Sequence, residues 1–230
     1  MNTYTLSPTT ITWETGCPAC LKAIANGWKK PRLPFPGLFS QLDRAQRQQW
    51  NGQSTMQLDM LLPPAMLNTR PKSVESVPFQ ATKQTAIIIK GRPDCRLEFS
   101  QPGVTGLLDF KSTKIDKNHS HYSPQLHSYA FADEHPAKGD RRSVNVLGLV
   151  VYEPQELVTH TEMTWDFKFI PIPYEPAKFK QLLRAIARHL EMEHPPSRPG
   201  CMFCAARAAG INANSGDDSW HNPITSEAHL

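Results

Sequence analysis

Three side chains with complementary chemistry lie close together in the sequence: Asp94, Asp109 and Lys111. Alternating apolar and polar residues predict two short strands, over 95–99 and 105–111, joined by a turn. Residues i and i+2 of a strand share a face, so Asp109 and Lys111 should point the same way. If the two strands pair as a hairpin, Asp94 approaches Asp109 at the end of the sheet.

Two carboxylates and an ammonium at one point suit the hydrolysis of a phosphodiester. Carboxylate oxygens are ligands that Mg²⁺ and Mn²⁺ prefer. Such an ion lowers the pKa of a bound water and offsets the charge that develops on the phosphate. A neighbouring lysine can orient the attacking water or stabilise the charged oxygen. The alternative is that the three residues are ordinary surface charges at strand ends.

Four of the five cysteines form two C-x-x-C pairs near opposite ends of the chain, Cys17 with Cys20 and Cys201 with Cys204. Four thiolates can complete a tetrahedral metal site, for which zinc is the default ion. Such a site would join the N- and C-terminal segments, and unrelated buried cysteines are the alternative. The fifth cysteine, Cys95, should point away from Asp94 and is predicted to be a buried core thiol.

The motif around the two aspartates resembles the signature of the PD-(D/E)XK nuclease superfamily. Asp94 follows a proline, and Asp109 and Lys111 stand as D-F-K. The following segment resembles the Q-x-x-x-Y motif of the RecB-like branch, with Gln125 and Tyr129 one helical turn apart. The resemblance covers roughly residues 84–131. It implies a metal-dependent DNA nuclease, a PD-(D/E)XK phosphodiesterase acting in repair, recombination or defence.

The resemblance also implies roles for individual residues. Asp94, Asp109 and the Phe110 carbonyl would hold Mg²⁺ or Mn²⁺, Lys111 would activate water, and Gln125 and Tyr129 would support the site. The family usually supplies a further ligand from an early helix, for which Asp43 is the candidate. Asp43 could instead be an exposed residue paired with Arg44 or Arg47. Without it, metal binding would be weaker, and a non-catalytic nucleic-acid-binding or protein-interaction module would become the alternative.

Some RecB-like exonucleases, including CRISPR-associated and AddB-type proteins, are similar in carrying cysteines before and after the nuclease core. These proteins bind a [4Fe–4S] cluster, usually with one cysteine before the core and three after it. The resemblance therefore favours a structural [4Fe–4S] cluster at the four cysteines, while their two-and-two division keeps Zn²⁺ open as the alternative. The expected partners are DNA, single-stranded DNA included, and a helicase or other repair or defence proteins.

The elements that must position these residues alternate between helix and strand. Helices are predicted over 8–28, 38–50, 122–133 and 176–194, and strands over 86–90, 95–99, 105–111, 144–152 and 162–172. This order predicts an α/β (α+β) fold with a central mixed sheet flanked by helices, which the resemblance makes restriction-endonuclease-like. We expect one domain over 1–210, with its core at 38–194, cysteine-bearing segments at 8–28 and 195–210, and a disordered tail over 211–230.

The composition is compatible with this function without demanding it. The chain has 25 Lys and Arg against 21 Asp and Glu, and a mildly basic protein tolerates a polyanion. Basic residues that could contact phosphates are Lys114, Lys117, Arg141, Arg142, Arg184 and Arg188. The sequence shows neither a signal-peptide pattern nor a membrane-spanning run, so we expect a cytoplasmic protein. It also lacks a Walker phosphate loop, which argues against helicase activity in this chain.

Overall fold

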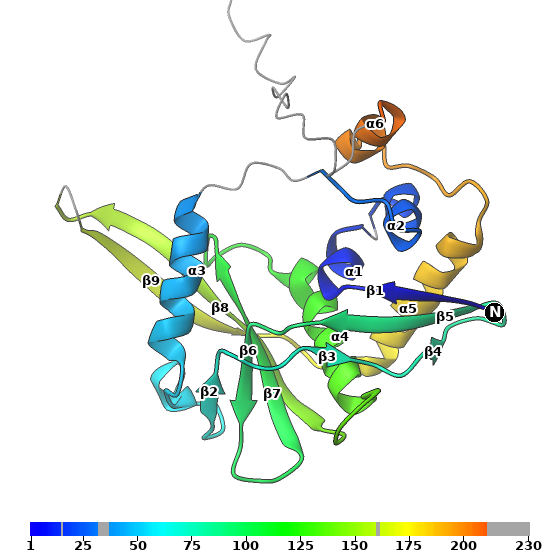
Figure 1. The fold of residues 1–230 in the computed structure, drawn as a ribbon. Helices are drawn as coiled ribbons and strands as arrows, with labels where there is room; N and C mark the ends of the chain where they lie inside the picture. The colour runs from blue at the N-terminus through cyan, green and yellow to red at the C-terminus, as the bar shows by residue number, and fades with distance from the viewer. Residues whose placement is uncertain (15, 32–36, 160–161, 211–230) are drawn as a thin grey trace, which may run out of the picture.

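The structure is a computed structural model that describes residues 1–14, 16–31, 37–159 and 162–210, arranged as in Figure 1. The predicted tail over 211–230 lies outside the described residues. The elements in chain order are β1 (Asn2–Leu6), α1 (Pro8–Glu14), α2 (Pro18–Ala25), α3 (Gly37–Trp50), η1 (Thr55–Gln57), β2 (Met66–Asn68), β3 (Val74–Glu75), β4 (Phe79–Gln80), β5 (Thr85–Gly91), β6 (Cys95–Glu98), β7 (Val104–Ser112), η2 (Ser120–Tyr122), α4 (Ser123–Glu134), β8 (Ser143–Leu157), β9 (Met163–Pro171), α5 (Pro176–Glu191) and α6 (Met202–Ala208).

The strand that carries the aspartate motif belongs to a five-stranded sheet in the order β2-β6-β7-β8-β9. The β7 and β8 strands are parallel, and the other pairs in this sheet are antiparallel. One face packs on α4, where Leu107 and Leu126 are fully buried. The opposite face buries Leu97 and Leu108 with Trp50 of α3. The two helices therefore cover opposite faces of the sheet, as Figure 1 shows.

A second, smaller sheet is built around β5. It pairs in parallel with β1 and antiparallel with β3 and β4. Ile87 and Ile89 of β5 are completely buried in one cluster with Leu183, Ile186 and Leu190 of α5. These three leucine and isoleucine side chains are spaced three and four residues apart, as an apolar stripe on one helix face requires.

The predicted fold class is confirmed: mixed sheets are flanked by helices, and the two ends of the chain meet at the four cysteines. Two details were wrong. The helix predicted over 8–28 is two helices, because Pro18 has no amide hydrogen to continue the first and begins α2 instead. The strand predicted over 86–90 lies outside the sheet of the aspartate motif. No helix within the described ranges is long and apolar enough to cross a membrane.

Candidate active site and four-cysteine centre

The two aspartates of the motif face each other across a pair of strands. The β6 and β7 strands are antiparallel, with Cys95 opposite Leu108. One residue beyond that pair, Asp94 stands opposite Asp109, and directly opposed residues share a face of the sheet. The Oδ2 of Asp94 accepts a hydrogen bond from the Phe110 backbone N–H at 3.2 Å. This bond holds the Asp94 carboxylate against β7, so the expected hairpin geometry is present.

Asp109 is the buried centre of the site, with a residue exposure of 1%. Its Oδ1 accepts a hydrogen bond from Gln125 Nε2 at 2.8 Å, and its Oδ2 forms an ion pair with the Lys111 ammonium. Lys111 Nζ also lies 3.5 Å from Gln125 Oε1 and 4.7 Å from the centre of the Tyr122 ring. The β7 strand and α4 thus bring the predicted catalytic lysine and glutamine to the same carboxylate.

Burial and neighbouring charges shift the pKa values of Asp109 and Lys111. Burial, with a further contribution from the negative charge of Asp94, raises the pKa of Asp109 to about 7, although Lys111 opposes the rise. Burial favours the neutral form of Lys111, but the charges of Asp109 and Asp94 outweigh it, so the pKa of Lys111 lies above its usual value. Lys111 therefore stays a cation at neutral pH, while Asp109 is a carboxylate that a nearby positive ion would keep ionised.

Tyr129, the other residue of the Q-x-x-x-Y motif, lies in the core rather than at the surface of the site. Its residue exposure is 5%, and burial raises the pKa of its hydroxyl. Its ring packs beside Gly91, where an added Cβ would lie 3.1 Å from Tyr129 Cε1 and 2.7 Å from Pro8 Cδ. Only glycine leaves room at Gly91 for the tyrosine and the start of α1 to approach so closely.

Asp43 does not join the two aspartates directly. Its carboxylate pairs with Arg47 at 3.0 Å, one helical turn along α3. Arg47 in turn donates to Asp94 Oδ1 at 2.5 Å and to the Asp94 backbone carbonyl at 3.1 Å. The α3 helix covers the face of the sheet opposite Asp109, so it reaches the site only around the end of β6. The pairing of Asp43 with Arg47 is the alternative that the sequence left open, and the metal-ligand role of Asp43 stays a prediction.

The carboxylate pair offers only part of the ligand set of a Mg²⁺ or Mn²⁺ ion. Within the described ranges, Asp94 and Asp109 have no third acidic or histidine side chain close enough to complete a three-residue metal site. Mg²⁺ commonly takes only one or two protein carboxylates and fills its other positions with water and substrate phosphates. The donor set is therefore sufficient for an ion that is shared with a phosphate.

The four paired cysteines do come together. The Sγ atoms of Cys17 and Cys204 lie 3.5 Å apart, those of Cys20 and Cys201 3.6 Å, and those of Cys20 and Cys204 3.4 Å. All four sulfur atoms lie within 4.8 Å of one another and could hold a metal ion. The predicted connection between the two ends of the chain is confirmed, through α2 and α6.

The protonation of these thiols reflects their crowding. Burial tends to raise the pKa of Cys17, but hydrogen bonds from Arg198 and Cys20 backbone groups and from neighbouring thiols lower it to about 7. Burial raises the pKa of Cys204 to about 11. The Cys17 thiolate is therefore readily formed, whereas a metal would be needed to ionise Cys20 and Cys204, whose pKa values burial raises. Cys95 is fully buried in the sheet core, as predicted, and burial raises its pKa to about 12.

One buried ion pair on the same face of the sheet was not foreseen. Arg96 of β6 donates to both carboxylate oxygens of Asp133 of α4, at 2.7 and 2.9 Å. The sequence carries a signal for it: Arg96 is two residues after Asp94, and Asp133 continues the four-residue spacing of Gln125 and Tyr129 along α4. Continuing the strand alternation from Asp94 to the next residue on that face, and the helix spacing from Tyr129 to the next turn, would have predicted the pair.

Comparison with known proteins adds little to this geometry. The sequence matches no protein-family model and no curated protein. A solved structure described as the crystal structure of SSO0001 is similar, with a TM-score of 0.48 and 15% sequence identity. The similarity covers 89% of this chain and 84% of that one.

Proposed function

We propose that this protein is a metal-dependent nuclease that hydrolyses phosphodiester bonds in DNA. The observation that carries the proposal is the contact between Lys111 and Asp109, with the Asp94 carboxylate held beside them by the Phe110 backbone N–H. Two carboxylates and one fixed cation at the same end of two strands provide oxygen ligands for a divalent ion and a positive charge for a phosphate.

Asp94 and Asp109 would hold Mg²⁺ or Mn²⁺, with the Phe110 carbonyl as a third oxygen ligand. When bound, the ion supplies Lewis acidity and makes a coordinated water more acidic. Gln125 fixes the orientation of the Asp109 carboxylate through its 2.8 Å hydrogen bond. Asp43 could add a ligand only if Arg47 released it.

Lys111 would act as a cation rather than as a base. Its raised pKa keeps the ammonium protonated, so it can donate hydrogen bonds to the attacking water or to the phosphate oxygens. A fixed donor in a water-poor site stabilises developing negative charge because the site does not have to reorganise during the reaction. Its burial beside Asp109 and its place over the Tyr122 ring restrict its position.

The test replaces Lys111 by alanine and compares it with Lys83→Ala, an exposed lysine that lies just before β5 and outside the carboxylate pair. Cleavage of single- and double-stranded DNA is measured with Mn²⁺ and, as a blank, without any added divalent ion. Lys111→Ala should cut at least about a hundredfold more slowly, as expected for loss of one electrostatic donor, while Lys83→Ala should cut normally. A folded Lys111→Ala protein that cleaves at the wild-type rate would overturn the proposal.

A non-catalytic nucleic-acid-binding module is the second candidate. The observation that favours it is that each oxygen of Asp94 and Asp109 already has a partner within the chain: Arg47, the Phe110 N–H, Gln125 and Lys111. An ion must therefore share these oxygens with a protein group or displace it. DNA retention by the wild-type protein without any Mn²⁺-dependent cleavage would select this candidate.

The spacing at the four cysteines favours a single tetrahedral ion, with zinc the default choice. A Zn–S distance of about 2.3 Å places thiolates about 3.8 Å apart in a tetrahedron, close to the sulfur separations of 3.4 to 3.6 Å. A [4Fe–4S] cluster puts iron and sulfide between the thiolates and needs a wider opening. Anaerobically purified protein should be colourless and contain about one zinc per chain, whereas a broad visible absorption band with bound iron would establish the cluster instead.

A further inference from the structure

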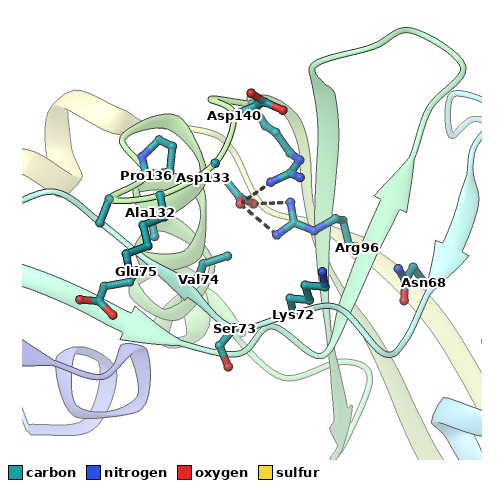
Figure 2. Close-up of a pocket in the computed structure, with 14 residues that line it drawn as sticks. Asn68, Lys72, Ser73, Val74, Glu75, Arg96, Ala132, Asp133, Pro136 and Asp140 are labelled. Atoms are coloured by element: carbon teal, nitrogen blue, oxygen red, sulfur yellow. Dashed lines mark hydrogen bonds and ion pairs between the residues drawn. The ribbon is translucent and has the colours of Figure 1, made fainter.

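A charged pocket of about 610 Å³ lies beside α4 and is separate from the carboxylate pair. Its walls are β6, the C-terminal part of α4, the segment before β3 and the loop 136–142. Figure 2 shows Arg96 and Asp133 facing each other across this space, with Lys72 and Ser73 on the side opposite Asp140. Polar and charged side chains dominate the walls, so the pocket is suited to a charged ligand rather than to an apolar one.

The floor of the pocket is a buried charge cluster with an excess of positive charge. Asp133, with a side-chain exposure of 1%, accepts two hydrogen bonds from Arg96. The guanidinium of Arg142 stands a further 3.8 Å from the same carboxylate. One carboxylate therefore faces two guanidinium groups, and the side chain of Arg142 is 44% exposed. Its remaining N–H groups are available to an anion.

The rim adds cations and little opposing charge. Lys72 and Lys138 line the pocket and are exposed. The structure records no ion pair for either lysine with any other described residue. Of the acidic residues in the walls, Glu75 is turned outward and pairs with Lys90 at 2.7 Å. A ligand in the pocket therefore contacts three positive side chains, those of Lys72, Lys138 and Arg142, and one further acidic side chain, that of Asp140.

The pocket and the candidate active site share one face of the sheet and one helix. Arg96 of β6 contacts Asp133 of α4, and Asp109 of β7 contacts Gln125 of the same helix. Asp133 follows Gln125 by two helical turns, which is about 12 Å at 1.5 Å per residue. A stacked nucleic-acid strand advances about 3.4 Å per nucleotide, so this distance corresponds to roughly three to four nucleotides.

We propose that this pocket binds a backbone phosphate of the substrate strand, a few nucleotides from the bond that is cut. The inference rests on the proposed function for the identity of the ligand. Basic side chains that contact phosphates fix the register of a strand without reading its sequence. The pocket would therefore set how much DNA must extend past the cleavage position for productive binding.

The test removes both rim lysines, Lys72→Ala with Lys138→Ala, and leaves the buried floor intact. The matched control is Lys83→Ala with Lys178→Ala, which removes the same charge from exposed lysines that lie outside the pocket. Binding of labelled single-stranded oligonucleotides of increasing length is measured by fluorescence anisotropy without added Mg²⁺ or Mn²⁺, so that no cleavage occurs and the metal at the four cysteines is retained. Equal urea midpoints for the two double variants establish that both are folded.

The pocket variant should bind long oligonucleotides about tenfold more weakly than the control, and its salt dependence should be shallower by about 1.4 in log–log slope, for two lost contacts to a single strand. For the control, affinity should increase when the strand becomes long enough to reach the pocket. For the pocket variant, that increase should be absent. Equal affinity and slope for the two double variants would overturn the inference, as would wild-type protein that retains no strand. Competition by millimolar inorganic phosphate at the wild-type pocket would assign it to a free anion instead.

The two proposals fail in different ways. If wild-type protein cleaves DNA but the pocket variant binds and cuts like its control, the pocket inference fails and the nuclease stands. If the pocket lysines control binding but Mn²⁺ produces no cleavage, the nuclease fails and the pocket stands.

Discussion

Replacing Asp133 by asparagine should destabilise the fold strongly, because it breaks the most deeply buried ion pair among the described residues. The Asp133 side chain is 1% exposed and that of Arg96 is 10% exposed. Asparagine has nearly the same shape, but it carries no charge and can accept only at one atom. The guanidinium of Arg96 would then remain buried without a counter-charge. Breaking a buried pair in this way costs about 3–5 kcal/mol.

That loss is large beside the roughly 5–15 kcal/mol that stabilises a typical domain. The Glu75–Lys90 pair offers a control, because its side chains are 45% and 58% exposed. Glu75→Gln should change stability by no more than about 1 kcal/mol. Replacing both members of the buried pair, Arg96→Met with Asp133→Leu, should recover much of the loss because no charge is left unpaired.

Urea unfolding followed by circular dichroism gives the free energy of unfolding for each variant at one fixed metal concentration. With the single variants Arg96→Met and Asp133→Leu measured as well, the double replacement completes a double-mutant cycle that isolates the interaction between Arg96 and Asp133. If Asp133→Asn destabilised no more than Glu75→Gln, or if the double replacement were as harmful as the single one, burial of the pair would not be the source of its energy.

The remaining predictions concern the two sites. Gln125→Ala should lower Mn²⁺-dependent cleavage about ten- to a hundredfold, because a buried hydrogen bond to a charged group contributes about 1.5–3 kcal/mol; an unchanged rate would contradict its role. Burial raises the pKa of Asp109 from 3.8 to about 7, so the folded protein holds a proton there that the unfolded chain has lost. Stability of the metal-free protein should therefore fall as pH rises from about 4 to 7, and calorimetric Mn²⁺ affinity should rise between pH 6 and 8 and level off above; a flat affinity would contradict this. Cys20→Ser should lower the thermal midpoint and release bound metal, whereas Cys95→Ser should leave the metal in place.

The local patterns in the sequence predicted the site better than they predicted the sheets. Asp109 and Lys111 share a face because a strand alternates every two residues, a property that the sequence carries without help from the rest of the fold. The same rule placed Cys95 in the core. Gln125 and Tyr129 followed from the helical spacing, and Gln125 does reach the Asp109 carboxylate.

The sheet partners could not be predicted because they depend on contacts between distant segments. The β1 strand, NTYTL, carries one buried side chain, Leu6, and forms against residues about eighty positions later in β5. The short strands β2, β3 and β4 have two or three residues each, too few to show a period. The position of α3 was equally hidden, so the choice between Asp43 as a ligand and Asp43 as a partner of Arg47 needed the structure.

The arrangement around the carboxylates indicates how an ion would enter. Lys111 is paired with the fully buried carboxylate of Asp109, and Gln125 is itself buried. Breaking either contact with Asp109 would therefore leave a buried polar group without a partner. Arg47 is different: its side chain is 27% exposed, and the Asp94 side chain that it contacts is 19% exposed. Arg47 also keeps a second partner in Asp43, so releasing Asp94 would not leave the guanidinium without a counter-charge. An ion that approaches from Asp94 would therefore disrupt fewer stabilising interactions than one that approaches from Asp109. An ion bound at Asp94 would take the place of the arginine as its positive partner and would offset the burial and the Asp94 charge that raise the pKa of Asp109.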